Sequence, residues 1–369
     1  MTDIQKENKS GGKVPNLRFP GFEDAWEVKK LGEVATNFMY GMNTAATVYD
    51  GENQYIRITD IDERTRLFTP NPLSSPDGEL EDKYLLEKGD ILFARTGASV
   101  GKSYLYSEKD GKIFFAGFLI RLNVKTENPY FIFSQTLTEK YQKWVLTMSM
   151  RSGQPGINAE EYKLLPIALP SFEEQSEIAF FLSKIDERIQ TQSKIINDLK
   201  TLKTATAKKI FSQELRFKDD NGNDFSKWEE MKLKNIVIIQ MGQSPDSSSY
   251  NFENIGIPLI QGNADILNRK SNPRQYTSKP TKFCDVGDLL LTVRAPVGYV
   301  GKSKHYACIG RGICSVKNND KSILEFIYQF LLYFEDKWKS IEQGSTFTAV
   351  NSSDINSINI LLPSIPEQT

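Results

Sequence analysis

The longest regular pattern of apolar and polar residues lies near the middle of the chain. From about Phe172 to Glu214 there is no glycine or proline, and apolar residues recur three and four positions apart. This spacing puts the apolar side chains on one stripe of a helix and is typical of a coiled-coil seam. We therefore predict a helix of about 40 residues, roughly 60 Å long. The seam residues are Ile178, Leu182, Ile185, Ile189, Ile196 and Leu199, with Gln192 as a polar insertion.

The same stripe would also suit a helix packed on a globular core, but its length and lack of helix breakers favour a spacer. On either side of it, short apolar segments bounded by Gly, Pro and Asn predict strands. In the first half the predicted strands are Val34–Asn37, Gln54–Thr59, Asp90–Ala94, Tyr104–Tyr106 and Phe118–Val124, followed by a helix at Pro129–Lys143. In the second half they are Ile236–Gln240, Pro258–Gln261, Asp288–Val293 and Ile313–Val316, followed by a helix at about Ile323–Ile341. Each half is thus predicted to be an α+β domain with a twisted β-sheet, loops at one end and a helix behind.

The two halves repeat one another, at a period of about half the chain. The outer anchors are Leu17-Arg18-Phe19 with Leu215-Arg216-Phe217, Trp26 with Trp228, Leu169-Pro170-Ser171 with Leu362-Pro363-Ser364, and Glu174-Gln175 with Glu367-Gln368. The inner anchors are Gly89-Asp90 with Gly287-Asp288, Arg95 with Arg294, and Gly101-Lys102-Ser103 with Gly301-Lys302-Ser303. Between the anchors the halves differ freely. We infer one fold that is used twice, for two different targets.

The repeat and the length of 369 residues, large for one core, predict two domains joined by the helix. The expected parts are a flexible tail (1–16), a first domain (17–171), a spacer helix (172–216), a second domain (217–364) and the start of a second helix (365–369). The rest of that second helix is expected to be missing. The seam of the first helix would then be partly bare. Either the chain was cut, or this is a natural short form, or a second molecule supplies the partner helix.

Composition narrows the class of protein. The chain is 39% apolar and 25% charged, as soluble globular proteins are. No apolar run approaches the ~18 residues of a membrane span, and the N-terminus lacks the apolar core of a secretory signal. Three cysteines in a chain of this length suggest a reduced, cytoplasmic setting.

The candidate catalytic and metal patterns are weak. Residues 97–103 resemble a phosphate-binding loop, but only three residues separate the two glycines where four are needed, so a tight turn between strands is preferred. Any mechanism that needs a histidine would depend on His305, the single histidine. With Cys284, Cys308 and Cys314 it could form a zinc site, but no pair has C-x-x-C spacing. We predict no catalytic set and no metal.

Charge differs between the halves. Residues 231–363 hold 15 basic and 11 acidic residues, a net charge of +4, whereas residues 31–170 hold 15 and 18, a net charge of −3. In the second half, Arg269, Lys270, Arg274, Lys279 and Lys282 surround Asn272 and Tyr276 without an acidic residue between them. Cations suit phosphates, and amides and guanidinium groups suit base edges, so this cluster favours DNA, although a solvated loop would look the same. Arg95 and Arg294 follow a strand in each half, and the alternative for them is a salt bridge to Asp90 or Asp288.

Three groups of residues resemble the specificity subunit of type I restriction-modification systems. They are Trp26 with Leu31-Gly32-Glu33-Val34, Gly89-Asp90-Ile91-Leu92 with Arg95-x-Gly97, and Leu169-Pro170 followed by Glu174-Gln175-x-Glu177-Ile178. The order of domain, helix, domain and start of a second helix is similar to that family as well. The resemblance covers nearly the whole chain from about Val14.

The resemblance implies a non-catalytic, cytoplasmic and nucleoid-associated protein that binds double-stranded DNA without a membrane. Each target-recognition domain would read one half of a split, gapped site. The helices would form an antiparallel coiled coil that docks two methyltransferase subunits, which carry S-adenosylmethionine and methylate adenine. Restriction/translocase subunits, which carry ATP and Mg²⁺, would join through them, and this chain would bind no cofactor. Helix packing and partner docking would fall to Leu182, Ile185, Ile189, Ile196 and Leu199, and an unpaired helix would allow self-association.

We predict direct readout of DNA by loops of both domains. In the first domain the candidates are Tyr40, Asn43, Thr44, Arg57, Arg64, Arg66, Arg95, Thr96 and Gln154. In the second they are Gln243, Ser244, Asn263, Arg269, Lys270, Arg274, Tyr276, Arg294, Thr346 and Thr348. The alternative is a stand-alone enzyme that methylates or cleaves DNA at its own site, and it would need an intact catalytic loop. A DNA mimic would need a strongly acidic surface, against which the net charge of −1 argues.

Overall fold

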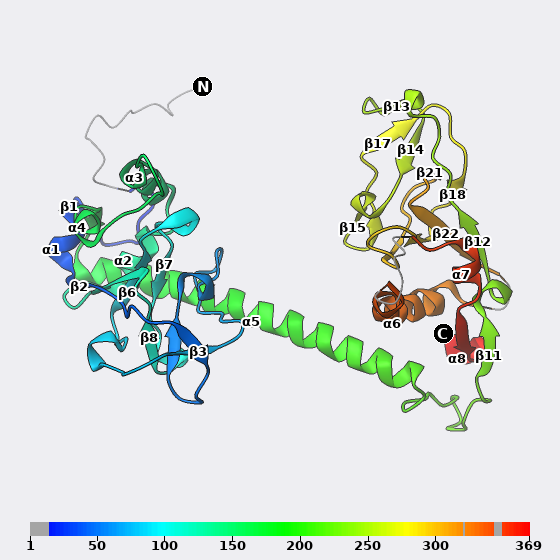
Figure 1. The fold of residues 1–369 in the computed structure, drawn as a ribbon, viewed down its shortest axis with the longest axis horizontal. Coiled ribbons are helices and arrows are strands. Elements are labelled where there is room, and N and C mark those ends of the chain that lie inside the picture. The colour runs from blue at the N-terminus through cyan, green and yellow to red at the C-terminus, as the bar shows by residue number, and fades with distance from the viewer. Residues whose placement is uncertain (1–14, 320–321, 343–348) are drawn as a thin grey trace. The chain divides into compact units, whose positions relative to one another are not determined.

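The computed structural model describes residues 15–319, 322–342 and 349–369. The chain divides into two compact units, Met1–Ser193 and Lys194–Thr369, with the boundary inside the long helix α5 (Phe172–Phe211). Both units are α+β, which confirms the predicted fold class (Figure 1). Helix α5 begins at the predicted residue and ends before the predicted limit, and the predicted limits of the individual domains stay a prediction.

A four-stranded antiparallel sheet forms the centre of the first unit, in the order β2-β9-β6-β7. Its strands are β2 (Thr36–Tyr40), β6 (Asp90–Ala94), β7 (Ser103–Leu105) and β9 (Leu119–Asn123). All five residues of β6 are buried because both faces of the sheet are covered. Alternate residues face opposite ways: Ile91 and Phe93 pack against the helices, whereas Leu92 and Ala94 pack in a second core beside the smaller strands.

Three short strand pairs complete the β-structure of the first unit. They are parallel β4 (Gln54–Ile56) with β8 (Ile113–Phe115), antiparallel β3 (Ala46–Val48) with β5 (Ser74–Pro76), and antiparallel β1 (Glu27–Lys30) with β10 (Pro166–Leu169). The helices are α1 (Leu31–Val34), α2 (Pro129–Gln135), α3 (Glu139–Ser149) and α4 (Ala159–Lys163). The single helix predicted at Pro129–Lys143 is therefore wrong. The Thr136 hydroxyl donates to the carbonyl of Phe133, and Thr138 caps a new helix by accepting from the amide of Tyr141.

The second unit contains a six-stranded sheet in the order β12-β22-β19-β20-β16-β15, a five-stranded sheet in the order β13-β17-β14-β21-β18, and the pair β11-β23. The strands are β11 (Glu229–Lys232), β12 (Val237–Met241), β13 (Tyr250–Asn251), β14 (Ile257–Ile260), β15 (Ile266–Leu267), β16 (Lys270–Ser271), β17 (Gln275–Thr277), β18 (Phe283–Cys284), β19 (Leu289–Thr292), β20 (Val300–Lys302), β21 (Ala307–Ile309), β22 (Ile313–Asn318) and β23 (Asn359–Leu362). The helices are α6 (Leu324–Glu342), α7 (Ser352–Asn356) and α8 (Ile365–Gln368). Helix α6 packs its apolar face on the larger core, and α8 lies at the predicted start of a second helix.

The outer anchors of the repeat are equivalent in the structure. Arg18 binds the carboxylate of Glu174 in the first unit, and Arg216 binds that of Glu367 in the second. Both glutamates are buried, so each arginine ties the first segment of its repeat to the helix at the end of that repeat, α5 or α8. The neighbouring glutamines repeat as well. Gln175 accepts from the amide of Asn128 and donates to the carbonyl of Pro170. Gln368 accepts from the amide of Ile323 and donates to the carbonyl of Pro363.

Two inner anchors are not equivalent, which corrects the sequence comparison. The amide of Arg95 donates to the carbonyl of Phe118, and the matching bond in the second unit comes from Val293, not from Arg294. The reason is strand register: counted from the paired aspartates Asp90 and Asp288, Arg95 is the fifth residue and Arg294 the sixth. Arg294 therefore corresponds to Thr96, and in both units that position forms an isolated bridge, to Gly156 or Ala349.

The Gly-Lys-Ser match is displaced in the same way. Gly101 donates to the carbonyl of Ala94 and Gly298 donates to that of Thr292, so Gly101 corresponds to Gly298 and not to Gly301. Both glycines have positive φ, 83° and 84°, and a Cβ would collide with a helix side chain, Val145 in the first unit and Trp338 in the second. The predicted tight turn between strands at residues 97–103 is confirmed, since it joins β6 to β7.

Candidate nucleic-acid interface

Five segments of the first unit meet at one end of its sheet. Gly41 and Met42 follow β2, and their amides donate to the carbonyls of Leu119 and Phe115. Residues 116–118 lie between β8 and β9, and the amide of Gly117 donates to the carbonyl of Met42. The end of β6 joins them through Arg95, whose amide donates to the carbonyl of Phe118. Arg57 follows β4, and the carbonyl of the residue before it, Ile56, accepts from the amide of Ala116. Loop 151–157 closes the group, because the amide of Ile157 donates to the carbonyl of Arg95.

Tyr40 and Arg95 form the centre of this group, the first loop cluster. The Arg95 guanidinium carbon lies 4.8 Å from the centre of the Tyr40 ring, a cation–π contact, and the Tyr40 hydroxyl accepts from the amide of Ala159 at 3.2 Å. In the part of the chain that the structure describes, the buried Nε of Arg95 has no hydrogen-bond partner. Among the described residues Arg95 does not form the salt bridge to Asp90 that was its predicted alternative, because Asp90 binds Asn123 and Arg121 instead.

Four other predicted residues of the first domain, Asn43, Thr44, Thr96 and Gln154, belong to the same loops. Asn43 is exposed, and the carbonyl of Thr44 accepts from the Tyr55 hydroxyl at 3.1 Å. The exposed Gln154 lies beside Gly97, next to Thr96.

Two arginines lie outside the first loop cluster, in the turn after β4. Arg66 folds back onto the protein: its side chain is 14% exposed and lies 3.6 Å from the carboxylate of Glu63. Arg64 is exposed in the same turn. The structure thus brings together all the predicted residues of the first domain except Arg64 and Arg66.

The second unit forms a second loop cluster at the equivalent end. Gly242 and Gln243 follow β12, and their amides donate to the carbonyls of Ile313 and Ile309, as Gly41 and Met42 do in the first unit. The Ser244 hydroxyl accepts from the amide of the exposed Arg311 at 3.1 Å. Asn263 lies in the turn after β14, and its side-chain oxygen is buried with no partner among the described residues. Arg294 is exposed at the end of β19.

The cationic run of the second domain does not form one patch. Arg269 binds both carboxylate oxygens of Glu335 on α6, the Nη2–Oε2 distance being 2.9 Å, and its guanidinium carbon lies 4.0 Å from the centre of the Tyr299 ring. Lys270 is exposed on β16, whereas Tyr276 lies in β17 between Asn251 and Pro258. The residues of this cationic run therefore contact different neighbours, because they lie in a turn and in two separate short strands, β16 and β17. Thr346 and Thr348 lie outside the described residues.

Two residues of the second loop cluster were not predicted from the sequence. Arg311 occupies the turn before β22, and Gln261 follows β14, where its side-chain amide donates to that of Gln275 at 3.2 Å. A usable signal was present in the strand pattern. Gln261 is the last residue of the predicted strand Pro258–Gln261, and Arg311 lies two residues before the predicted strand Ile313–Val316.

The cysteines and the histidine serve separate structural roles. Cys314 is buried in the large core of the second unit, whereas Cys284 lies in a smaller core. Burial raises the pKa of the Cys314 thiol to about 12. The Nδ1 atom of His305 is hydrogen-bonded to the Ser271 hydroxyl at 2.7 Å. Among the described residues, no group of three or more His, Cys, Asp or Glu side chains is placed to hold a metal ion.

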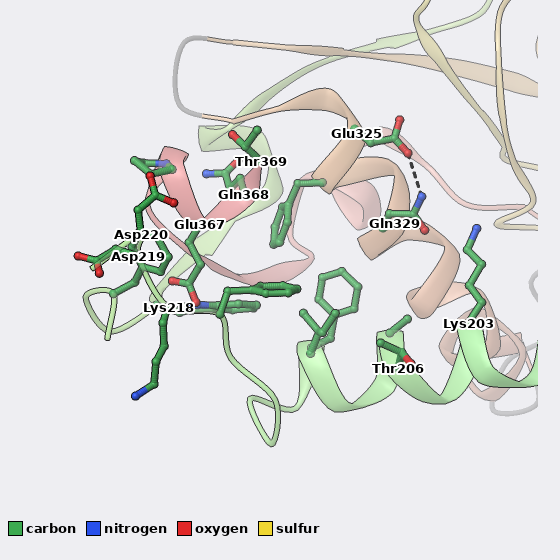
Figure 2. A pocket seen from close by; sticks show the side chains of 18 of the residues that line it. Lys203, Thr206, Lys218, Asp219, Asp220, Glu325, Gln329, Glu367, Gln368 and Thr369 are labelled. Carbon is green, nitrogen blue, oxygen red and sulfur yellow. Dashed lines mark hydrogen bonds between the residues drawn. The ribbon is translucent and has the colours of Figure 1, made fainter. Parts of the chain in front are cut away.

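A groove of about 980 Å³ lies in the second unit, along the last turns of α5 (Figure 2). Leu199 and Leu202 of α5 line it, together with Phe217 and α6. On the opposite side Glu367, Gln368 and Thr369 reach it from the end of the chain, as Figure 2 shows. The predicted seam residues Ile185, Ile189, Ile196 and Leu199 are 42–59% exposed, and Leu182 is partly buried. None of the described helices is both long and apolar enough to span a membrane.

The comparisons with known proteins agree on one family. The model of the type I restriction modification DNA specificity domain matches residues 23–201 and again residues 225–369. The MjaX type I restriction enzyme specificity subunit of Methanocaldococcus jannaschii is 36% identical over 299 residues, which cover 78% of this chain and 70% of that protein. The MjaVIII specificity subunit of the same organism is 24% identical over a match that covers 95% of this chain and 85% of that one.

The fold is shared with a solved structure. The S subunit of a type I restriction-modification system from M. genitalium has a TM-score of 0.63 at 17% identity, over 95% of this chain and 87% of that chain. The two matches of the family model fall on the two repeated units, either side of residues 202–224. The chain therefore belongs to the family of type I restriction-modification DNA specificity proteins.

Proposed function

We propose that this chain is the DNA specificity subunit of a type I restriction-modification complex, and that it is not itself catalytic. Each unit would bind one half of a split, gapped DNA site. The observation that supports this most directly is the pair of loop clusters, which lie at equivalent ends of two repeated folds and carry different side chains. A shared frame with different loops suits two readers of two different sequences.

The chemistry of the loop clusters fits double-stranded DNA. The first presents Tyr40, Arg95 and Gln154, and the second presents Gln243, Arg294 and Arg311. Guanidinium groups bind phosphates or guanine, and amides bind adenine, so both positioning and base-reading contacts are available. Base-reading residues are worth ~1–3 kcal/mol each at one position, whereas phosphate contacts weaken binding to every sequence alike.

The catalytic parts would belong to other chains. We propose two methyltransferase subunits as partners, which would carry S-adenosylmethionine and methylate adenine. Restriction/translocase subunits with ATP and Mg²⁺ would join through them, and the complex would act in the cytoplasm, on the nucleoid. No cofactor is assigned to this chain.

Helix α5 would be the spacer and a docking surface. Its exposed seam places Ile189, Ile196 and Leu199 on one stripe, and burying each side chain is worth ~1.5–3 kcal/mol. We propose an antiparallel partner helix on this stripe, from a second copy of this chain where no other helix covers it. Sedimentation of the purified chain tests this: a dimer is expected, and an I189K/I196K variant is expected to be monomeric.

Adenine methylation tests the proposed function. Cells that hold the partner methyltransferase, with and without this chain, are compared by single-molecule sequencing of modified bases. A gapped, two-part adenine motif that requires the chain is expected. A motif that is present without the chain, or no motif although the complex forms, would contradict the proposal. Purified chain with S-adenosylmethionine alone is the control, since methylation there would support the stand-alone enzyme.

The same assay tests the spacer. Inserting four residues near Thr201 in α5 is expected to change the number of base pairs between the half-sites and to leave both half-site sequences unchanged. An unchanged gap, with the variant still active, would contradict the assignment of α5 as the spacer.

A further inference from the structure

A buried aspartate occupies the same place in both loop clusters. In the first unit, Asp60 Oδ2 accepts from the amide of Arg57, the residue that follows β4, at 2.9 Å. In the second, Asp265 Oδ2 accepts from the amide of Gln261, which follows β14, at 2.8 Å. The side chains are only 3% and 6% exposed. The next turn repeats too, since the carbonyl of each aspartate accepts a backbone amide at 2.7 Å, from Thr69 or Asn272.

Each aspartate also holds an arginine, but the two arginines come from different places in the chain. Arg57 stands three residues before Asp60 and donates to it through Nε and Nη2, both at 2.8 Å. Arg274 stands nine residues after Asp265 and donates through Nε at 2.9 Å. At the position of Arg57 the second unit has Gln261. The carboxylate has thus stayed in place while the source of the guanidinium group has changed.

This geometry leaves the same edge of each guanidinium group open. The carboxylate takes Nε, and in Arg57 also the N–H of Nη2 that lies beside it. Within the described part of the chain, Nη1 of Arg57 and both terminal nitrogens of Arg274 have no hydrogen-bond partner. The two arginine side chains are 34% and 62% exposed. Two parallel N–H groups on the open edge match O6 and N7 of guanine, the bidentate contact typical of arginine in the major groove.

We propose that Asp60 and Asp265 are positioning residues, and that Arg57 and Arg274, which they hold, each read one guanine, one in each half of the DNA site. This inference rests on the proposed function and goes further, since it names the base and the residues. A buried carboxylate fixes the plane and direction of a flexible side chain, so the arginine loses less conformational entropy on binding. An internal ion pair alone would not explain why the arginine is retained while its source changes.

The test uses the full chain in complex with its methyltransferase subunits. Once the wild-type motif is known, binding is measured to duplexes in which each base pair of both half-sites is changed in turn, at two salt concentrations. The variants D60N and R57K alter the first unit, and D265N and R274K alter the second. Lysine keeps the charge but loses the fork, so R57K retains a cation for phosphates and cannot make the bidentate contact. The exposed Glu52, 72% exposed and paired with Lys112, gives the control E52Q.

D60N and R57K are expected to lower the preference for guanine at one position of one half-site by about 10-fold, within the ~5–150-fold range of one bidentate pair. The other half-site is expected to be unchanged. D265N and R274K are expected to do the same to the opposite half-site only. Each pair is thus the matched control of the other, and E52Q should change neither half-site.

A relocated arginine provides a rescue. R274Q should lose the preference in its half-site, and R274Q/Q261R should recover it, because Asp265 then faces an arginine placed as Arg57 is placed beside Asp60. Recovery is an outcome that a purely structural role of Asp265 does not predict.

The outcomes separate this inference from the proposed function. Unchanged binding by R57K or R274K, or equal weakening on all sequences, would mean that the arginine contacts phosphate and would overturn guanine readout. Unchanged preference in D60N and D265N would overturn the positioning role. A wild-type complex without any sequence preference would instead contradict the proposed function itself.

Discussion

The two units share a frame and differ in what the frame holds. In both, an arginine binds a buried glutamate at the start of a helix, and a tryptophan packs edge-on against a helix phenylalanine, Trp26 on Phe131 and Trp228 on Phe326. The loop clusters share a buried aspartate, Asp60 or Asp265, but differ at other positions: where the first unit places Arg95 against Tyr40, the second places the buried Val293. The difference teaches that the repeat preserves contacts that fix the fold, whereas exposed loop ends are free to change.

The largest expected effect comes from matched truncations in the two cores. Phe93 and Leu291 stand at equivalent positions of β6 and β19 and are at most 1% exposed. F93A should cost the first unit about 3–5 kcal/mol and L291A the second about 2–5 kcal/mol. Urea unfolding followed by tryptophan fluorescence measures both. Each variant should lower the transition of its own unit only, and an equal loss in both units would show that they unfold as one.

A smaller effect is expected from the partner of the repeated aspartate. Asp90 is fully buried, 3.8 Å from Nη1 of Arg121, which is 7% exposed, whereas Asp288 lies 3.4 Å from Nζ of the 31% exposed Lys317. R121A leaves a buried carboxylate without its cation and should cost the first unit ~3 kcal/mol. K317A should cost the second about 1 kcal/mol or less, because water screens that pair. Urea unfolding checks both values, and R121A/D90N, which removes the stranded charge, should recover part of the loss.

The stability loss in R121A should depend on pH. Burial raises the pKa of Asp90 above its ordinary value, against the hydrogen bonds from Glu87 and Asn123 and the charge of Arg121. Below the ordinary carboxyl pKa the group is protonated in both states and costs nothing. As the pH rises through the ordinary pKa and then the raised one, the folded state loses stability. R121A should therefore be closer to wild type at acid pH than at pH 7, and equal losses at both would contradict this origin.

The smallest effect concerns the thiols, which lie only in the second unit. Burial raises the pKa of Cys314 to about 12, so the thiol is almost wholly protonated at pH 8. Labelling with a thiol reagent should be slow in the native chain and should follow unfolding of the second unit. L291A should accelerate it and F93A should not. Rapid labelling of the native chain would show that this core opens readily.

Local sequence determined the parts of this protein that depend on near neighbours. Uninterrupted helix formers at a three-four spacing are enough to define α5 from Phe172, and the outer anchors of the repeat, such as Glu174 with Glu367, mark the frame because the same buried contacts recur. The family followed from the order of these anchors. In the loop clusters the sequence indicated strand ends, and the structure brings most of the predicted residues together there.

Only the tertiary structure decided which residues are equivalent inside the frame and what each arginine does. Strand register depends on hydrogen bonds between residues far apart in the chain, so Arg95 and Arg294 look alike in sequence yet stand one position apart on their strands. Likewise, Arg269 and Arg274 belong to one cationic run, but the fold gives the first to Glu335 and the second to Asp265. An ion pair is set by which carboxylate the folded chain brings within reach, and distance along the sequence does not contain that information.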